Sequence, residues 1–293
     1  MMRRVLALIS LLALTTSVAE VSAAGRLPSS IVLTVTSGGV ERDFILHAQP
    51  TDTPKPLVLI FHGGGGSAQF MARRSSAFAD LLLTRGYAVA FMNGSSHRDG
   101  RNFRTWNGGH CCAHAMTTRI DEGNYIDQAI AAIAAHTPVD RSRIFLMGHS
   151  NGGMVTYRWL ATLRTKVRGI VVISSAMFAD QPAIPQGTSA FLTHTHDDNN
   201  VAFNASFAPK QKRAWDAPPL PFLEAEARMA QLLDCDNPNE QRVADGVIKR
   251  DHTCTSGAEL TVVVSETGGH EWPKSIPGFS LEDAILKFLD HQR

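Results

Sequence analysis

Residues 148–152 have the sequence Gly-His-Ser-Asn-Gly, a Gly-x-Ser-x-Gly pattern that could do nucleophilic chemistry. A short apolar run, 144–147, precedes the pattern, and an amphipathic stretch with helical periodicity follows it from Asn151. A serine at such a strand-to-helix turn is exposed at a helix N-terminus, where free amides and the helix dipole favour negative charge. The pattern therefore predicts that Ser150 is a nucleophile; the alternative is a glycine-rich turn with a merely structural serine.

A serine hydroxyl needs a base to take its proton, and the base needs a carboxylate to hold its tautomer. The acid should follow a later strand, and Asp197 and Asp198 both follow the apolar run 189–193. The base should follow the last strand, and His270 comes directly after the run 260–266. We therefore expect His270 to be the base and one of the two aspartates to be the acid.

The glycine-rich segment 61–67, Phe-His-Gly-Gly-Gly-Gly-Ser, follows another short apolar run, 57–61. Acyl transfer needs two backbone N–H donors aimed at the developing oxyanion. One donor should be the amide of Asn151, directly after the nucleophile, and the other should come from the glycine-rich segment, most simply from Gly64. A phosphate-cradling loop is the alternative, but no Gly-Lys-Ser or Gly-Lys-Thr pattern follows the glycines.

Short apolar runs alternate with helical patterns along most of the chain. Continuous apolar strands bounded by helices indicate a mostly parallel sheet covered by helices on both faces. Together with the order serine, acid, histidine, this predicts an α/β-hydrolase fold, with residues 25–293 as a single catalytic domain. The expected strands are 31–36, 41–48, 57–61, 87–92, 143–147, 169–174, 189–193 and 260–266, and the expected helices are 69–85, 119–136, 151–164, 222–235 and 281–291.

The composition excludes several classes of protein. The 293 residues carry 28 Lys and Arg against 27 Asp and Glu, a formal net charge of +1, and 44% of them are hydrophobic. This balance argues against an electrostatic nucleic-acid binder and against a disordered chain. With 4 cysteines the chain is not a disulfide scaffold. We expect no nucleic-acid partner and no steering of a strongly charged polymer, and the composition leaves the oligomeric state open.

The N-terminus has the three-part layout of a secretory signal peptide. Residues 1–4 form a short basic segment, residues 5–14 form an apolar run, and small residues follow with Ala-x-Ala-like sites near Ala19, Ala23 or Ala24. The apolar run spans only about 15 Å as a helix, too little for a hydrocarbon core about 30 Å thick. We therefore predict that residues 1–24 are removed, and that the mature protein is secreted or periplasmic without a membrane anchor.

Other residues near the candidate triad invite binding roles. Residues 110–114, His-Cys-Cys-Ala-His, offer four metal ligands, but adjacent cysteines are poorly spaced for one tetrahedral zinc, so we predict no metal site. Trp106, Trp272 and His149 are candidate substrate-binding residues, because aromatic walls suit an apolar acyl pocket. Packing in the core is the alternative for both tryptophans.

These segments together resemble the secreted poly(3-hydroxybutyrate) depolymerase and feruloyl esterase family of α/β-hydrolases. The resemblance runs roughly from residue 56 to the C-terminus, and the matching segments are 62–67, 106–107, 111–112, 139–143, 148–154, 194–201 and 269–273. The family's acid pattern, laid on residues 194–201, selects Asp198 with Asp197 as the alternative. The family also implies a disulfide between Cys235 and Cys254, which leaves residues 111 and 112 as free thiols or a vicinal disulfide.

The resemblance implies a secreted serine esterase that needs no cofactor and acts on a small-molecule, oligomeric or polymeric ester. In such an enzyme Ser150 attacks the ester, His270 transfers protons and Asp198 orients His270. The amides of Gly64 and Asn151 hold the oxyanion, and the near-zero net charge suits a neutral ester. The alternatives are a secreted serine peptidase with the same triad and a non-catalytic binding module on a hydrolase scaffold.

Overall fold

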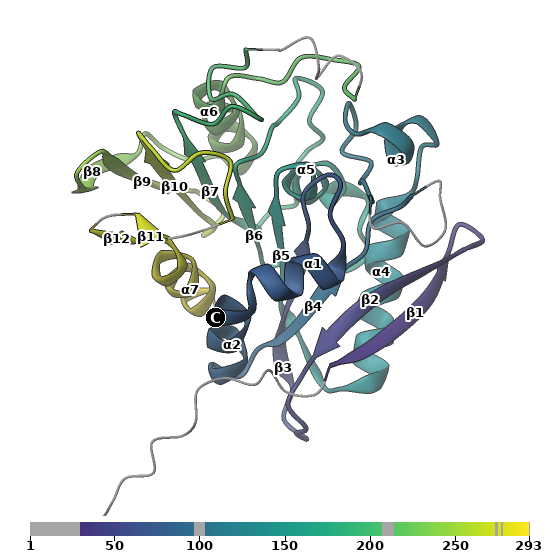
Figure 1. Ribbon diagram of the computed structural model, residues 1–293. Helices are drawn as coiled ribbons and strands as arrows, with labels where there is room; N and C mark the ends of the chain where they lie inside the picture. The colour runs from purple at the N-terminus through teal and green to yellow at the C-terminus, as the bar shows by residue number, and fades with distance from the viewer. Residues whose placement is uncertain (1–29, 97–102, 207–213, 273–274, 277, 293) are drawn as a thin grey trace, which may run out of the picture.

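The computed structural model describes residues 30–96, 103–206, 214–272, 275–276 and 278–292 (Figure 1). The predicted signal peptide, residues 1–24, lies outside the described residues. The main sheet consists of β1 (Ile31–Ser37), β2 (Val40–His47), β3 (Lys55–Phe61), β4 (Ala88–Met92), β5 (Val139–His149), β6 (Gly169–Ile173), β7 (Ser189–Thr195), β8 (Asn239–Ala244), β9 (Val247–Thr253) and β10 (Glu259–Ser265). The helices are α1 (Ala68–Arg74), α2 (Ser76–Thr84), α3 (Ala113–Thr117), α4 (Glu122–His136), α5 (Asn151–Arg158), α6 (Phe222–Leu233) and α7 (Leu281–His291), with a 3₁₀ turn at Leu160–Thr162 and a small strand pair, β11 (Ser275–Ile276) and β12 (Phe279–Ser280).

The strands of the main sheet follow the order β1-β2-β4-β3-β5-β6-β7-β10-β9-β8. The six middle strands, β4-β3-β5-β6-β7-β10 in spatial order, pair in parallel. Antiparallel pairs lie at the two edges, β1 with β2 at one and β9 with β8 at the other. Parallel strands need crossover helices, so both faces of the middle of the sheet become covered. The result is the predicted mostly parallel sheet between helical layers, with a mixed pattern at its edges.

Strand β3 shows how the two helical layers are built. All seven of its residues are buried, which explains the unbroken apolar run at 57–61. Leu57, Leu59 and Phe61 pack into the hydrophobic cluster that contains residues of α4, α5 and α6. Val58 and Ile60 point the other way, into the cluster formed with α1, α2 and α7. Alternate side chains of one strand therefore hold both layers together.

Several elements differ from their predicted bounds, such as β5, predicted at 143–147, and others, such as α3, were not predicted. The helix predicted at 69–85 is two helices that meet at Ser75, whose hydroxyl donates to the Met71 carbonyl at 2.7 Å. Such a bond to the preceding turn competes with the helical ladder and breaks it. The helix predicted at 151–164 ends at Arg158. The hairpin of β8 and β9 was not predicted, because its strands are polar and partly exposed.

Both pairs of cysteines are disulfide-bonded. The bond between Cys235 and Cys254 confirms the predicted pairing and ties the end of α6 to the end of β9. Cys111 and Cys112 are bonded to each other, so the vicinal disulfide is the form that the structure adopts. Among the helices of the described residues, none is both long enough and apolar enough to cross a bilayer.

Candidate active site

Ser150 stands on a strained turn between β5 and α5. Its φ of 55° and ψ of −124° lie outside the regions that side chains usually adopt. A Cβ on Gly148 would collide with the backbone of Gly152, and a Cβ on Gly152 would collide with the carbonyl of Phe61. The two glycines of the Gly-x-Ser-x-Gly pattern are therefore required by close backbone approach, and the turn lifts the Ser150 side chain above the carboxyl end of the sheet.

Ser150, His270 and Asp198 form one hydrogen-bonded chain. His270 Nε2 lies 2.8 Å from Ser150 Oγ, although the two residues are 120 positions apart. His270 Nδ1 lies 2.7 Å from Asp198 Oδ2. The three residues follow β5, β10 and β7, which are parallel, so their carboxyl ends lie on the same side of the sheet. In this arrangement a neutral imidazole can accept the serine proton while its other N–H donates to the carboxylate.

The carboxylate of Asp198 is buried and fully engaged. Its Oδ1 accepts the amides of Asn200 and Val201, each at 2.8 Å. Burial alone raises the pKa of Asp198, but the hydrogen bond and charge of His270, together with these two amides, outweigh it and hold the pKa below its usual range. Asp198 is therefore ionised at neutral pH and suited to stabilise a charged imidazole.

Asp197, the alternative acid, contacts the loop of the histidine instead of its ring. Its carboxylate accepts the amide of Gly269 at 2.8 Å and the amide of Gly268 at 3.2 Å. The hydroxyl of Thr195 donates to the Gly269 carbonyl at 2.9 Å. Slight burial raises the pKa of Asp197, and the bonds from Gly269, Thr195 and Gly268 outweigh it and lower the pKa. The two aspartates thus separate into one that contacts the imidazole and one that fixes the backbone beside it.

The two predicted oxyanion donors, Gly64 and Asn151, lie next to each other. A Cβ on Gly64 would be 3.6 Å from the Asn151 Cβ. Asn151 is the first residue of α5, so its amide is one of the first-turn N–H groups that lack an intrahelical acceptor. The neighbouring amides of Gly65 and Gly66 donate to the carbonyls of Arg104 and Gly63, whereas the described backbone hydrogen bonds leave the Gly64 amide unused. The geometry suits two donors that converge above Ser150.

Trp106 lies in the core and not on the pocket surface, which corrects the prediction that it binds substrate. Its side chain is 0% exposed and packs against Phe61. Its indole Nε1 donates to the His62 carbonyl at 2.9 Å, and its backbone amide donates to Asn151 Oδ1 at 2.8 Å. The Asn151 side chain returns a hydrogen bond to the Trp106 carbonyl at 3.1 Å. Trp106 thus connects the glycine-rich segment to the start of α5.

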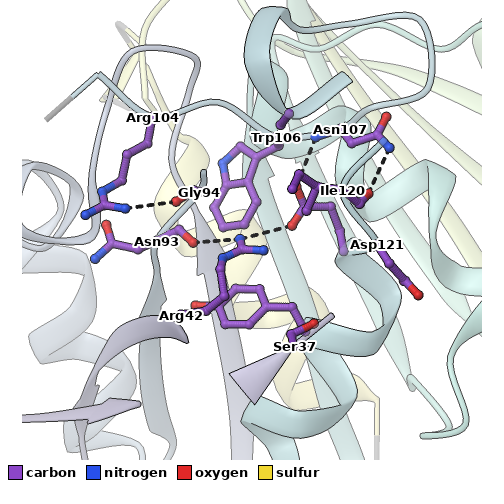
Figure 2. Close-up of polar contacts among 12 residues, drawn as sticks. Ser37, Arg42, Asn93, Gly94, Arg104, Trp106, Asn107, Ile120 and Asp121 are labelled. Atoms are coloured by element: carbon purple, nitrogen blue, oxygen red, sulfur yellow. Dashed lines mark hydrogen bonds and ion pairs between the residues drawn. The ribbon is translucent and has the colours of Figure 1, made fainter. Parts of the chain in front are cut away.

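A buried ion pair anchors the loop that carries Trp106 (Figure 2). Arg42 donates to Glu122 Oε2 at 3.1 Å and to the Asn93 carbonyl at 3.0 Å, and its guanidinium lies 3.9 Å from the Tyr125 ring centroid. Glu122 Oε1 accepts the amide of Asn107 at 3.0 Å. The sequence offered no signal for this pair, because its members are 80 positions apart and lie in segments without a motif.

Trp272 is also buried, at 3% exposure, and packs edge-on against Phe78, so it does not form the predicted pocket wall. His149 does line the pocket, in agreement with its predicted location. Its ring lies 4.8 Å from the His270 ring, centroid to centroid. Burial, followed by the charges of His270 and Arg74, lowers the pKa of His149 to about 3, so its ring stays neutral beside the triad.

The pocket over Ser150 and His270 has a volume of about 460 Å³. The glycine-rich segment forms one side, and residues of α1 form another. Phe70 of α1 lines the pocket and is 50% exposed. Phe103, 68% exposed, lies with its ring beside Gly65 of the same segment. Sequence reasoning missed both phenylalanines, since only the direction of a helix face or loop distinguishes them from the other aromatic residues.

The His110 to His114 segment holds no cluster of metal ligands. Its two cysteines are bonded to each other, and His110 contacts Asp216 at 2.6 Å and Asp180 at 3.1 Å. Within the described residues no group of three or more His, Cys, Asp or Glu side chains is arranged to hold a metal ion.

Comparisons with known proteins agree with this fold. The family model Hydrolase_4, described as serine aminopeptidase S33, matches residues 52–212, more than half of the chain. The protein "Putative esterase NocK" of Nocardia uniformis subsp. tsuyamanensis is 25% identical over 282 residues, which cover 88% of this chain and 78% of that protein. The structure of an acetyl xylan esterase from Aspergillus awamori matches with a TM-score of 0.62 at 12% identity, covering 89% of this chain and 99% of that one. A ferulic acid esterase matches with a TM-score of 0.53 at 12% identity, covering 90% and 97%.

Proposed function

The chain belongs to the Hydrolase_4 family of α/β-hydrolases, and from that membership we propose that it is a serine esterase. The observation that carries the proposal is the hydrogen-bonded chain from Ser150 through His270 to Asp198 at the floor of a partly apolar pocket. The relative and the structural neighbours whose names contain esterase favour an ester over a peptide as the substrate.

The first half of the proposed reaction forms an acyl-enzyme. Ser150 Oγ attacks the ester carbonyl carbon while its proton passes to His270 Nε2, and the carbonyl oxygen becomes an oxyanion held by the amides of Gly64 and Asn151. The tetrahedral intermediate then collapses. The bond to the alcohol oxygen breaks, and that oxygen takes the proton from His270. Asp198 stabilises the imidazolium throughout these steps.

The second half releases the acid. A water molecule gives a proton to His270 Nε2 as its oxygen attacks the acyl carbon, and the oxyanion forms again in the same position. Collapse breaks the bond to Ser150 Oγ, which recovers its proton from His270. The net reaction is an ester plus water giving an acid plus an alcohol, and the residues of the chain return to their starting states.

Within the esterases, we propose a short hydroxyalkanoate or an aryl acid as the acyl group, as in polyhydroxybutyrate depolymerases or feruloyl esterases. The sequence resemblance to that family supports this narrower class. So does the pocket, whose volume of about 460 Å³ and exposed Phe70 suit a short apolar or aromatic chain. A panel of hydroxybutyrate oligomers, methyl ferulate, acetylated xylan and short aryl esters separates these substrates.

We also propose that the protein is exported, with residues 1–24 as the signal peptide and residues 25–293 as the catalytic domain. The three-part N-terminal sequence supports this proposal. The bond between Cys235 and Cys254 is compatible with an oxidising compartment. N-terminal sequencing of protein recovered from the periplasm or medium of an expressing bacterium tests both the export and the cleavage site.

The test of the proposed activity is the variant Ser150→Ala with p-nitrophenyl butyrate as substrate. We expect activity to fall to the background rate while the circular dichroism spectrum and the melting temperature stay near those of the parent. Ser256→Ala, at an exposed serine in the turn before β10, is the matched control and should keep full activity. Retained activity in a folded Ser150→Ala protein contradicts the proposal.

The description of the matched family as serine aminopeptidase favours the peptidase alternative. Assaying aminoacyl p-nitroanilides beside the esters distinguishes the two activities. If the protein were a non-catalytic module, a fluorophosphonate probe would leave Ser150 unlabelled. Labelling that disappears in Ser150→Ala, with ester cleavage and no anilide cleavage, is the result that we expect.

A further inference from the structure

The pocket over Ser150 has a basic wall. Arg73 and Arg74, the last two residues of α1, line the same cavity as Ser150 and His270. Phe70 and Met71 of the preceding turn line it as well, so apolar and cationic groups stand side by side on one helix. Among the described residues, the lining contains no aspartate or glutamate. The net charge of +1 hides this local excess, because acidic residues elsewhere balance it.

The two arginines differ in their partners. Arg74 forms an ion pair with Glu271, the residue directly after His270. Arg73 is exposed, and no described acidic side chain forms an ion pair with it. Arg73 can therefore engage a ligand without breaking an existing ion pair, whereas Arg74 would have to share its own.

The positive charge of Arg74 extends to His149, beside the reaction site. After burial and the charge of His270, the charge of Arg74 is the next contribution that lowers the pKa of His149. A basic residue in the last turn of a helix is favoured by the helix dipole, which accounts for arginine at these positions. The dipole does not account for both side chains facing the catalytic pocket, since a helix end also offers a solvent face.

We propose that this wall binds a carboxylate of the substrate, with Arg73 as the main contact. The substrate class is an ester that also carries a free carboxylate, such as a short oligoester of a hydroxy acid, which ends in one. A guanidinium matches a carboxylate with two parallel N–H···O bonds. The chain of the substrate lies along Phe70 while its carboxylate reaches Arg73. This inference rests on the proposed esterase function and names the substrate of that same site.

The experiment compares charged and neutral substrates of nearly equal size. The 3-hydroxybutyrate dimer and its methyl ester place the charge on the alcohol side of the scissile bond, and monomethyl adipate and dimethyl adipate place it on the acyl side. Chromatography of the products gives kcat/KM for each compound, and each pair gives a ratio of charged to neutral substrate. The ratios are measured for the parent, for Arg73→Gln and for a control variant.

The control is Arg141→Gln, which makes the same charge change at an exposed residue of β5. Arg141 lies nine residues before Ser150 on that strand, at the opposite end of the sheet, about 30 Å away for an extended chain. The Debye length at physiological ionic strength is about 8 Å, so the charge of Arg141 is screened well before it reaches Ser150. A general loss of positive charge would affect both variants, whereas a contact in the pocket affects only Arg73→Gln.

We expect Arg73→Gln to lower the charged-to-neutral ratio roughly three- to tenfold in at least one substrate pair, mainly through KM, and Arg141→Gln to leave both ratios unchanged. The effect should shrink as salt is raised from 50 to 500 mM. Unchanged ratios in both pairs for Arg73→Gln overturn the inference. They leave the proposed function intact if the neutral esters are still cleaved and Ser150→Ala abolishes that cleavage. If none of the esters is cleaved by the parent, the esterase proposal itself fails.

Discussion

Asp197 and Asp198 are neighbours in the sequence, yet they hold the same histidine loop at different points. Asp198 lies 2.7 Å from the imidazole of His270, and Asp197 accepts the amide of the preceding Gly269 at 2.8 Å. Asp197 lies in the turn that follows β7 and Asp198 comes directly after it, so one aspartate reaches the ring and the other reaches the backbone. The position of His270 over Ser150 therefore depends on both.

The two aspartates should differ sharply when each is changed to asparagine. Asp198→Asn favours the wrong tautomer of His270 and removes the charge that stabilises its protonated form, so kcat should fall by roughly 10³- to 10⁴-fold. Asp197→Asn loses only a backbone contact of the loop, and kcat should fall by about tenfold or less. Steady-state kinetics with p-nitrophenyl butyrate measures both. A larger loss in Asp197→Asn than in Asp198→Asn would reverse the assignment of the two roles.

Trp106→Phe should slow catalysis although Trp106 does not reach the pocket. The change keeps an aromatic ring in the core but removes the N–H that holds the His62 carbonyl. The glycine-rich segment then loses one anchor, and we expect kcat to fall about tenfold with little change in KM, because the oxyanion forms only during the reaction. Trp159→Phe is the matched control, since the Trp159 indole donates to the Asn107 carbonyl, outside that segment. Equal losses of kcat in the two variants would contradict a specific role of Trp106.

The stability of the protein should decrease in mildly acidic solution. Burial lowers the pKa of His62 to about 4 and that of His149 to about 3, from an ordinary value of 6.5. Between these values the unfolded chain binds protons that the folded chain excludes. The free energy of unfolding therefore falls as the pH drops from 6.5 toward 4, by roughly 1.4 kcal/mol per pH unit for each histidine.

Urea melts at pH 7.5, 6 and 5 test this dependence. His149→Phe removes one of the titrating groups without removing a described side-chain hydrogen bond of His149, so the loss of stability with falling pH should become less steep. His136→Phe changes an exposed histidine at the end of α4 and should keep the steepness of the parent. Identical steepness in all three proteins would show that His149 does not contribute to the acid sensitivity.

Removal of the disulfide at the end of α6 should destabilise the fold without altering the site. Cys235 and Cys254 are 19 positions apart, and a bond that closes a loop of this length stabilises a protein by roughly 3 kcal/mol. The double variant Cys235→Ala and Cys254→Ala should lose about that much in urea melts and should keep its kcat at 20 °C. A change below about 0.5 kcal/mol would mean that packing around α6 already fixes this region.

The sequence was most informative where burial is complete. Strands such as β3 and β6 are buried along their whole length, so their apolar runs identified them. The β8–β9 hairpin was missed because an edge pair needs few apolar residues. Its one signal was the Asp245-Gly246 pair, a sequence typical of tight hairpin turns, with a φ of 65° at the glycine.

The sequence predicted some residues of the candidate site and misplaced others. The order of motifs along the chain identified Ser150 and His270, because the carboxyl ends of parallel strands meet in space. The position of the acid after its strand left Asp197 and Asp198 open, the family pattern selected Asp198, and the structure places Asp198 against the His270 ring. Trp272 was misplaced because closeness in sequence to a catalytic residue does not set the direction of a side chain. Trp272, two residues after His270, packs into the core.

The distances along the chain between the triad residues have a consequence for the kinetics of folding. The nucleophile and its base are 120 positions apart, and they meet only after β10 has docked on β7. Helices form from local contacts in microseconds, whereas pairing distant strands requires closing long loops and is slow. On refolding from denaturant, hydrolytic activity should return later than the far-ultraviolet circular dichroism of the helices. The rate at which cleavage of a chromogenic ester returns therefore reports when β10 docks on β7.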